Sequence, residues 1–356
     1  MKLNLSLFKN ILAVCLLGFF AIGAFMGGNL FNNFKFIKEP QPLNLLIYNH
    51  FISPEVFHDI ENNYNLKINV DYADSLFEIE DKLKDPKAKY DLISIYSFQA
   101  LELDEEARLQ PINWSLIKNL KNISSDFMSL GGDELSKKLL PLSWGVNGIA
   151  YDESKFKGPI ESWEQVLIQL PAKEHILLMD IPLSLFQLGQ LKSKSLQKNA
   201  ASEQNLKNAL SNLMKFADLY HLGSAHIPLV RNYALIEAAQ AGLPKETAMK
   251  SFKFVIPKEG GLFWTLNLAE PRFAPHPKEI AVFLGAILEK KVALSILNFG
   301  GASSTSLTLN DENVDPKLKA QFIREIPLTK LKFQTSFPDA GLFSQLIEEA
   351  QKASKK

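Results

Sequence analysis

The sequence predicts an α/β protein of two lobes with a ligand cleft between them. Apolar runs of strand length alternate with amphipathic segments of helix length from Leu43 to Tyr96, which is typical of a parallel sheet covered by helices. The same pattern starts again near Pro141. A chain of 356 residues also suits two lobes better than one compact core.

The first lobe begins with three expected strands joined by two expected helices. Ser53 can cap the first helix and Pro54 suits its first turn, while Val56, Phe57 and Ile60 follow at helical spacing. The strands are residues 43–49, 66–73 and 90–96, and the helices are residues 53–65 and 74–84.

Parallel sheets place ligands at the carboxyl ends of their strands. In the first lobe two of these ends are the segments Tyr48-Asn49-His50-Phe51 and Tyr96-Ser97-Phe98. We therefore expect a binding site where these two segments meet.

The second lobe is expected to contain a similar mixture of elements. Two glycines within Leu140–Asp152 indicate two short strands around a turn. The remaining expected elements are helices at 161–167, 203–220 and 233–241 and strands at 175–180 and 252–257. We assign residues 43–140 with 266–309 to lobe 1 and residues 141–265 with 310–356 to lobe 2, so that hinges lie near 140–141, 265–266 and 309–310.

The charge composition argues against nucleic acid as a partner. The 39 basic side chains are balanced by 39 acidic ones, whereas nucleic-acid binding needs a basic surface. We expect a monomer that binds a small molecule.

The first 31 residues differ from the rest of the chain. Lys2 and Lys9 precede an uncharged apolar run, Ile11–Phe31, which is typical of an export signal peptide. The run is also long enough to span a bilayer, so an uncleaved N-terminal membrane anchor stays open. Cys15 is the only cysteine, and the apolar run continuing behind it argues against lipid attachment. The exported body therefore has no disulfide.

The sequence offers no motif for an enzyme, a metal or a cofactor. None of the six histidines forms HExxH, and His221 and His226 do not have the spacing of a helical metal pair. Nucleophile-elbow, phosphate-loop and dinucleotide-binding patterns are also absent from the sequence. We predict a protein that is not an enzyme and carries no cofactor.

A glycine pair stands before an aromatic pair in FVIPKEGGLFW, Phe254–Trp264. Gly260 and Gly261 free the backbone for a tight turn or a close approach. The pattern favours either a turn that leads into a core aromatic residue or a turn that directs the Trp264 ring at a ligand.

These residues resemble the periplasmic spermidine/putrescine-binding (polyamine-binding) proteins of bacterial ABC importers. The resemblance extends from Leu43 to the C-terminus, with its motifs in the family's order. It implies a type II-like periplasmic binding protein fold, a periplasmic location, and an ABC permease in the inner membrane as partner. The matching motifs are PKEGGLFW at 257–264, LAEP at 268–271, LPLSWGVNGIAYD at 140–152, SWEQV at 162–166, ILLMD at 176–180 with Phe186-Gln187, and YDLI at 90–93.

The resemblance also implies a set of ligand-binding positions. In the family the tryptophan that matches Trp264 packs flat against the ligand's carbon chain, and a late glutamine that matches Gln334 reaches the ligand. The positions near the two strand ends are Asn49, His50, Phe51, Ser53, Tyr96, Ser97 and Phe98.

The departures from the family concern charge. Where the family lines its cleft with carboxylates to hold a cationic ligand, this chain has Ile181, Ser184 and Leu266, and a second family tryptophan falls on Arg231. An arginine is suited to a carboxylate or phosphate. We therefore expect an anionic or zwitterionic ligand.

Other interpretations remain open. Arg231 would have no ligand role if it faced solvent or paired with Asp180 or Glu237. The chain would then be a spermidine/putrescine-binding protein with a diverged cleft, or a sensing or structural protein with a vestigial one.

Overall fold

The computed structural model divides the chain into two compact units, Met1–Pro40 and Gln41–Lys356. All described residues belong to the second unit, and none of their helices has the length and hydrophobicity needed to cross a membrane. The expected signal peptide or anchor lies outside them. The structure describes residues 41–49, 51–74, 76–85, 87–129, 132–169, 175–179, 185, 188, 208, 210–215, 217–220, 235–239, 252–300, 303–309 and 331–332.

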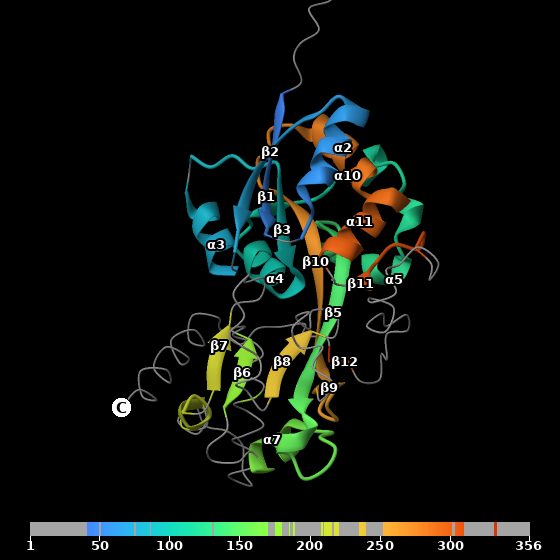
Figure 1. Ribbon diagram of the computed structural model, residues 1–356. Coiled ribbons are helices and arrows are strands. Elements are labelled where there is room, and N and C mark those ends of the chain that lie inside the picture. Colours follow the sequence, from blue (N-terminus) through green and yellow to red (C-terminus); the bar gives the residue numbers. More distant parts are fainter. Residues whose placement is uncertain are drawn as a thin grey trace, which may run out of the picture. The chain divides into compact units, whose positions relative to one another are not determined.

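The first three strands form a parallel sheet, as predicted, and their order in the sheet is β2–β1–β3. The connecting helices α2 and α3 pack on opposite sides of these strands in Figure 1. This part of the fold follows from local sequence, because each strand is a short apolar run and each helix carries one apolar face. The bounds are β1 Pro42–Tyr48, α2 Pro54–Tyr64, β2 Lys67–Ala73, α3 Leu76–Lys84 and β3 Leu92–Tyr96.

Helix α2 begins where the sequence predicts, but its cap differs. Ser53 occupies the N-cap position without a side-chain bond to the helix backbone, so the expected capping bond is wrong. Packing holds the helix instead: Val56, Phe57 and Ile60 are buried, and the Phe57 ring stacks 6.3 Å from Phe283 of α10 (Pro277–Ile287).

Two long strands extend the sheet. Strand β10 (Gly261–Pro271) lies between β3 and β5 (Leu139–Asp152) and pairs antiparallel with both. Figure 1 shows β5 and β10 running side by side, and the sheet order is β2–β1–β3–β10–β5–β8–β6–β7. The sheet is therefore mixed, with antiparallel strands at its centre. Short strands at its margins are β4 Leu109–Gln110, β9 Phe252–Val255, β11 Ser303–Ser304 and β12 Leu331–Lys332.

The expected turn within residues 140–152 is wrong, because β5 is one continuous strand. Its glycines make room for neighbouring aromatic rings. A Cβ at Gly145 would overlap the Trp264 indole, and a Cβ at Gly148 would lie 2.6 Å from the Phe254 ring. Glycine here permits close packing across the sheet.

Two expected helices of the second lobe are also wrong in part. Residues 210–213 are helical as predicted, but Ala217–Tyr220 forms strand β7, which pairs parallel with β6 (Ile176–Met179). Strand β8 (Leu235–Ala239) replaces the helix expected at 233–241. It pairs with β5 on one side and β6 on the other, so tertiary pairing overrides the helix propensity of its sequence, LIEAA.

The remaining described helices belong to both ends of the sheet. Figure 1 places α10 beside α2 and α11 near the beginning of β5. The bounds of these elements are α4 Ser97–Glu105, η1 Trp114–Leu116, η2 Leu120–Asn122, α5 Ser125–Met128, α6 Gly132–Leu135, η3 Glu153–Lys155, α7 Trp163–Gln169 and α11 Lys290–Gly300.

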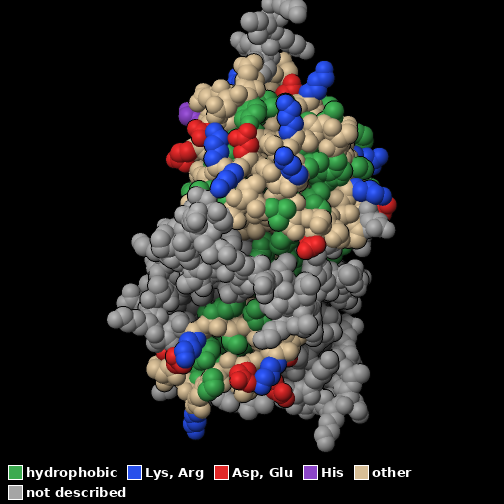
Figure 2. Space-filling model, turned by 90° about the vertical axis from the view of Figure 1, so that its right-hand side faces the viewer, with side chains coloured by type: hydrophobic (Ala, Val, Ile, Leu, Met, Phe, Trp, Pro, Cys, Tyr) green, Lys and Arg blue, Asp and Glu red, His purple; other side chains and the backbone are tan. Residues whose placement is uncertain are grey.

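The described residues bury two main hydrophobic clusters. The larger surrounds β1, β3 and β10 and includes Trp264, and the smaller surrounds β6 with residues such as Ile149 and Trp163. On the face shown in Figure 2, basic and acidic side chains are interspersed, in line with the balanced composition.

Candidate functional site

The structure describes eight of the thirteen expected binding residues. The other five, His50, Ile181, Ser184, Arg231 and Gln334, lie outside the described residues. The eight come from the ends of β1 and β3 and from β10: Asn49, Phe51, Ser53, Tyr96, Ser97, Phe98, Trp264 and Leu266.

An aromatic cluster brings three of these residues together. Tyr96 stacks on Phe98 with ring centres 5.3 Å apart and an interplanar angle of 5°. Trp264 meets the same tyrosine nearly edge-on, with centres 5.3 Å apart and planes at 82°. Tyr48 adds a fourth ring, 5.1 Å from Tyr96. The carboxyl ends of β1 and β3 and the start of β10 thus share one aromatic assembly, joined by favourable ring geometries.

Gln99 of α4 fixes the two tyrosines of this cluster. Its Oε1 accepts hydrogen bonds from the Tyr48 hydroxyl at 2.7 Å and from the Tyr96 backbone amide at 3.2 Å. Burial raises the pKa of both phenols; for Tyr48 the neighbouring Tyr96 raises it further, while the bond to Gln99 opposes the shift. Both hydroxyls therefore stay protonated at neutral pH.

Ser97 and Leu266 hold β10 against β3. The Ser97 hydroxyl accepts a 3.1 Å hydrogen bond from the Thr265 amide, and Leu266 pairs with Tyr96 in the strand ladder. The Leu266 side chain is buried in the same hydrophobic cluster as Trp264. Leu266 is therefore surrounded by apolar residues in the structure.

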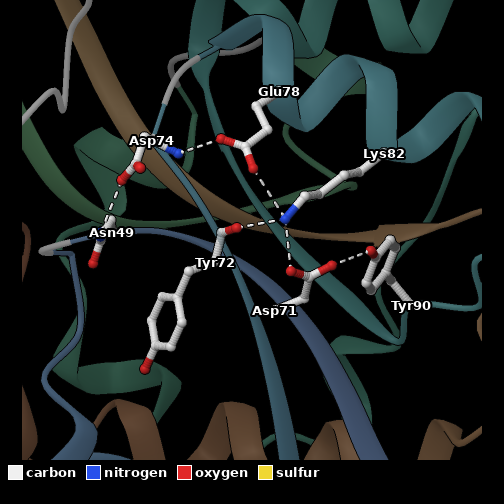
Figure 3. Close-up of polar contacts among 7 residues, drawn as sticks. All are labelled: Asn49, Asp71, Tyr72, Asp74, Glu78, Lys82 and Tyr90. Atoms are coloured by element: carbon white, nitrogen blue, oxygen red, sulfur yellow. Dashed lines mark hydrogen bonds and ion pairs between the residues drawn. The ribbon is translucent and has the colours of Figure 1, made fainter.

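Asn49, Phe51 and Ser53 follow the end of β1. The Asn49 side chain donates a 2.8 Å hydrogen bond to Asp74 at the end of β2, and its backbone amide bonds to Ala73. Asn49 is therefore tied to the adjacent strand, as Figure 3 shows. Phe51 and Ser53 are buried, so among these three only Asn49 has its polar side chain at the surface.

A polar network behind Asn49 secures the same edge of the sheet (Figure 3). The Lys82 ammonium binds Asp71 at 2.6 Å, the Tyr72 carbonyl at 2.6 Å and Glu78. Burial alone would raise the pKa of Asp71, but hydrogen bonds from Lys82 and Tyr90 outweigh it and hold that pKa below its ordinary value. The network joins α3 to β2 and so stabilises the end of β2, to which Asn49 is hydrogen-bonded.

The glycine pair before Trp264 serves two purposes. Gly260 has a φ of 98°, a left-handed conformation that favours glycine. Gly261 lies where a Cβ would collide with the Asn147 carbonyl. Before them, the Glu259 carboxylate accepts hydrogen bonds from the amides of Trp163 and Glu164, both at 3.1 Å, and so caps α7. This turn sets the start of β10.

Trp264 is held on all sides. Its indole lies over Gly145, its Nε1 donates a 2.8 Å hydrogen bond to Asn147, and only 4% of the residue is exposed. The ring is therefore a core residue in this structure, packed against the aromatic cluster. Any ligand contact with it requires the surrounding residues to separate.

Comparison with known proteins gives a consistent result. No family model matches the chain. The spermidine/putrescine-binding periplasmic protein of Salmonella typhimurium is 24% identical over 335 residues, which cover 87% of this chain and 92% of that protein. The chain is a relative of the periplasmic spermidine/putrescine-binding proteins.

Solved structures of solute-binding proteins share the fold. The spermidine/putrescine ABC transporter substrate-binding protein PotD of Streptococcus pneumoniae is 21% identical, covers 88% of this chain and 99% of its own, and has a TM-score of 0.66. A periplasmic binding protein of A. tumefaciens in complex with agropinic acid has a TM-score of 0.60 at 13% identity, covering 88% of this chain and 99% of its own. The two-lobed periplasmic binding protein fold is therefore confirmed.

Sequence reasoning missed several residues around Trp264. Gly145 and Asn147 stand in the family motif LPLSWGVNGIAYD, but nothing in their spacing indicates that they support the Trp264 indole, which lies 117 positions beyond Asn147. Glu237 was expected on a helix, whereas on β8 its carboxylate is buried beside Asn147. A charged residue inside an apolar stretch was the one available signal.

The groups that this site offers are aromatic rings and side-chain amides, which are buried in this structure. Among the described residues, no cluster of His, Cys, Asp or Glu side chains is placed to bind a metal ion. A cavity of about 540 Å³ borders Pro271, Arg272 and Phe273. It lies at the other end of β10, about 23 Å from Trp264 at roughly 3.3 Å per strand residue.

Proposed function

We propose that this protein is the extracytoplasmic solute-binding protein of an ABC importer, which binds a small ligand by lobe closure and delivers it to a permease in the inner membrane. The observation that carries the proposal is the aromatic cluster of Tyr48, Tyr96, Phe98 and Trp264, which lies where the carboxyl ends of parallel strands β1 and β3 meet antiparallel β10. Such strand ends are where α/β folds bind ligands. The ligand undergoes no covalent change.

The ligand is an anionic or zwitterionic organic molecule. Ile181, Ser184 and Leu266 stand where the polyamine-binding family has carboxylates, and Arg231 replaces an aromatic residue. Burying a cationic ligand without carboxylate partners costs on the order of several kcal/mol of binding free energy. The fold itself accommodates acids, since a structural neighbour binds agropinic acid.

Polyamine binding is the second candidate. Relatives carry names that include spermidine and putrescine, and one observation favours a cation here. The carboxylate of Glu237 is buried two hydrogen bonds from the Trp264 indole, so the region is not without negative charge.

A thermal-shift screen of organic acids, phosphonates, amino acids and polyamines separates the candidates. We expect an acid or zwitterion to raise the melting temperature, and Arg231→Ala to remove most of its binding. Arg272→Ala is the matched control, because Arg272 is exposed at the far end of β10. If only polyamines raise the melting temperature, the charge assignment is wrong and the second candidate holds.

Spermidine affinity gives a quantitative test. Loss of two charge-assisted contacts, each of about 1.5–3 kcal/mol, predicts binding two to four orders of magnitude weaker, roughly, than with the carboxylates present. Calorimetric titration should find at most weak binding. Micromolar or tighter affinity would contradict the assignment of Ile181, Ser184 and Leu266 to the cleft.

The protein acts in the periplasm. Its N-terminal 31 residues direct export and are either removed or kept as a membrane anchor. Ala21 and Gly23 offer small residues for signal-peptide cleavage. Mass spectrometry of the protein from soluble and membrane fractions distinguishes the two, because a mature chain that begins after Gly23 requires cleavage. Recovery from the cytoplasm with Met1 intact would contradict export.

A further inference from the structure

Three buried side chains from three strands form a hydrogen-bonded chain. The Trp264 indole Nε1 donates to Asn147 Oδ1 at 2.8 Å, and Asn147 Nδ2 donates to Glu237 Oε1 at 3.3 Å. The other carboxylate oxygen of Glu237 accepts the Met179 backbone amide at 3.2 Å. The exposed fractions are 4% for Trp264, 3% for Asn147 and 1% for Glu237.

The direction of this chain is determined by the chemistry of its members. An indole nitrogen can only donate, so the Asn147 amide must turn its oxygen toward Trp264 and its nitrogen toward Glu237. Each of the two Glu237 oxygens then faces an N–H group. An ionised carboxylate meets this demand because both of its oxygens accept.

We propose that Glu237 is a positioning residue, which orients the ligand-binding ring of Trp264 through the side chain of Asn147. The ligand contact of Trp264 rests on the proposed function, whereas the orientation of its ring does not. A carboxylate in a buried strand is unfavourable unless hydrogen bonds compensate, and here the bond from Asn147 links the carboxylate directly to the indole. The arrangement fixes the rotamer of Trp264 before any ligand arrives.

Glu237→Gln is the sharpest perturbation because it keeps the size of the side chain. A glutamine has one acceptor and one donor group in place of two acceptors. If its oxygen serves Met179, its NH2 group faces the NH2 group of Asn147. Rotation of the Asn147 amide relieves that conflict but turns an NH2 group toward the Trp264 indole. One donor of the chain therefore loses its oxygen acceptor, and where that donor is Asn147 Nδ2 only the weaker Met179 sulfur at 3.2 Å remains.

The indole signals of the full chain report on this effect directly. With isotope-labelled tryptophan, proton–nitrogen correlation spectra show the four indoles, and Trp264→Phe assigns the relevant signal. We expect Glu237→Gln to shift the Trp264 signal and to speed the exchange of its indole proton with solvent about 10- to 100-fold. This factor corresponds to the loss of the charge-assisted hydrogen bond between Asn147 and Glu237. Trp144 is the internal control, because its indole bonds to the Ser304 carbonyl and should not change.

A second substitution provides rescue. In the protein that carries both Glu237→Gln and Asn147→Asp, the carboxylate moves one position along the chain and each donor again has an acceptor. The Trp264 signal should then return toward its original position, and its indole proton should again exchange slowly with solvent. A general loss of packing would not produce this recovery.

Two results overturn the proposal. One is an unchanged Trp264 indole signal in Glu237→Gln; the other is equal disturbance of Trp144 and Trp264 without recovery in the double substitution. If Glu237→Gln does not fold, the unaltered protein still decides, because rapid exchange of the Trp264 indole would show that the bond to Asn147 is not formed. None of these readouts needs a ligand, so failure of the proposed function is distinguished from failure of this inference.

Discussion

Gly145 is the residue on which the Trp264 ring rests. A Cβ at this position would lie 2.8 Å from the indole Cε2 and closer still to Cζ2, so Gly145→Ala must displace the ring or β5. We expect a loss of about 1–3 kcal/mol in the free energy of unfolding, the usual effect of overpacking. Urea denaturation measures it.

Gly285→Ala in α10 is the matched control for that substitution. The nearest atom to a Cβ there is the Lys118 backbone nitrogen at 3.3 Å, and alanine favours the helix by about 1 kcal/mol. The free energy of unfolding of Gly285→Ala should equal or exceed that of the unaltered protein. Equal effects at both glycines would show that the indole does not lie against Gly145.

The buried carboxyl of Glu270 makes the stability of the fold depend on pH. Its carboxyl is buried in β10, and burial raises its pKa above the ordinary value of 4.5, with Asp91 adding to the shift and the hydrogen bond from Gln110 opposing it. The folded state therefore binds the proton more tightly than the unfolded state. This contribution to stability is full below pH 4.5 and is lost as the pH rises through the folded-state pKa.

Glu270→Gln removes that titration and keeps an acceptor for Gln110. We expect the variant to be more stable than the unaltered protein at pH 7 and to lose this advantage near pH 4. Thermal unfolding at both pH values measures the difference, and the same exchange at exposed Glu164 is the control. An advantage that grows on acidification would reverse the sign and refute the burial effect.

At the scale of elements, Asp91 joins three of them. Its carboxylate accepts the Asn44 amide of β1 at 2.8 Å and the His276 amide, at the N-cap of α10, at 3.0 Å, and it contacts the His276 ring at 3.0 Å. The side chain lies just before β3 and is fully buried. It is therefore the junction that holds α10 against β1.

Asp91→Asn tests this junction. An amide accepts at one group only, so one of the two backbone donors is left without a partner, at a cost of about 1.5–3 kcal/mol. Hydrogen exchange should also quicken in the first turn of α10 while α7 stays unchanged. If α10 and α7 respond alike, Asp91 contributes to general stability and not to this junction.

For the whole molecule, the bulge at Leu142 of β5, opposite Leu266 and Asn267 of β10, is the expected site of bending. The register against β5 shifts between Leu266 and Asn267, next to the predicted hinge near Thr265. Bulges bend strands, so a change in lobe angle can concentrate here. We expect solution scattering to show a smaller radius of gyration when a compound identified in the screen is added, and no change for Trp264→Ala at the same concentration. An unchanged radius with saturated compound would exclude closure.

The sequence by itself determined those features that depend on near neighbours. Strands β1, β2 and β3 and helices α2 and α3 follow from apolar spacing within about ten residues, and the turn at Gly260 follows from its backbone freedom. The motif that ends in Trp264 also indicated the family, because its residues are adjacent in the chain.

Tertiary structure alone decided the rest. Residues 235–239 form a strand because they lie between β5 and β6, although their composition favours a helix. Likewise, Gly145 lies within a continuous strand and not in a turn, and the Trp264 ring occupies the space that a side chain at this position would need. Asn147, Glu237 and Trp264 meet only when three strands far apart in sequence pair. Local patterns carry no record of such contacts, since each depends on which distant segment supplies the neighbouring backbone.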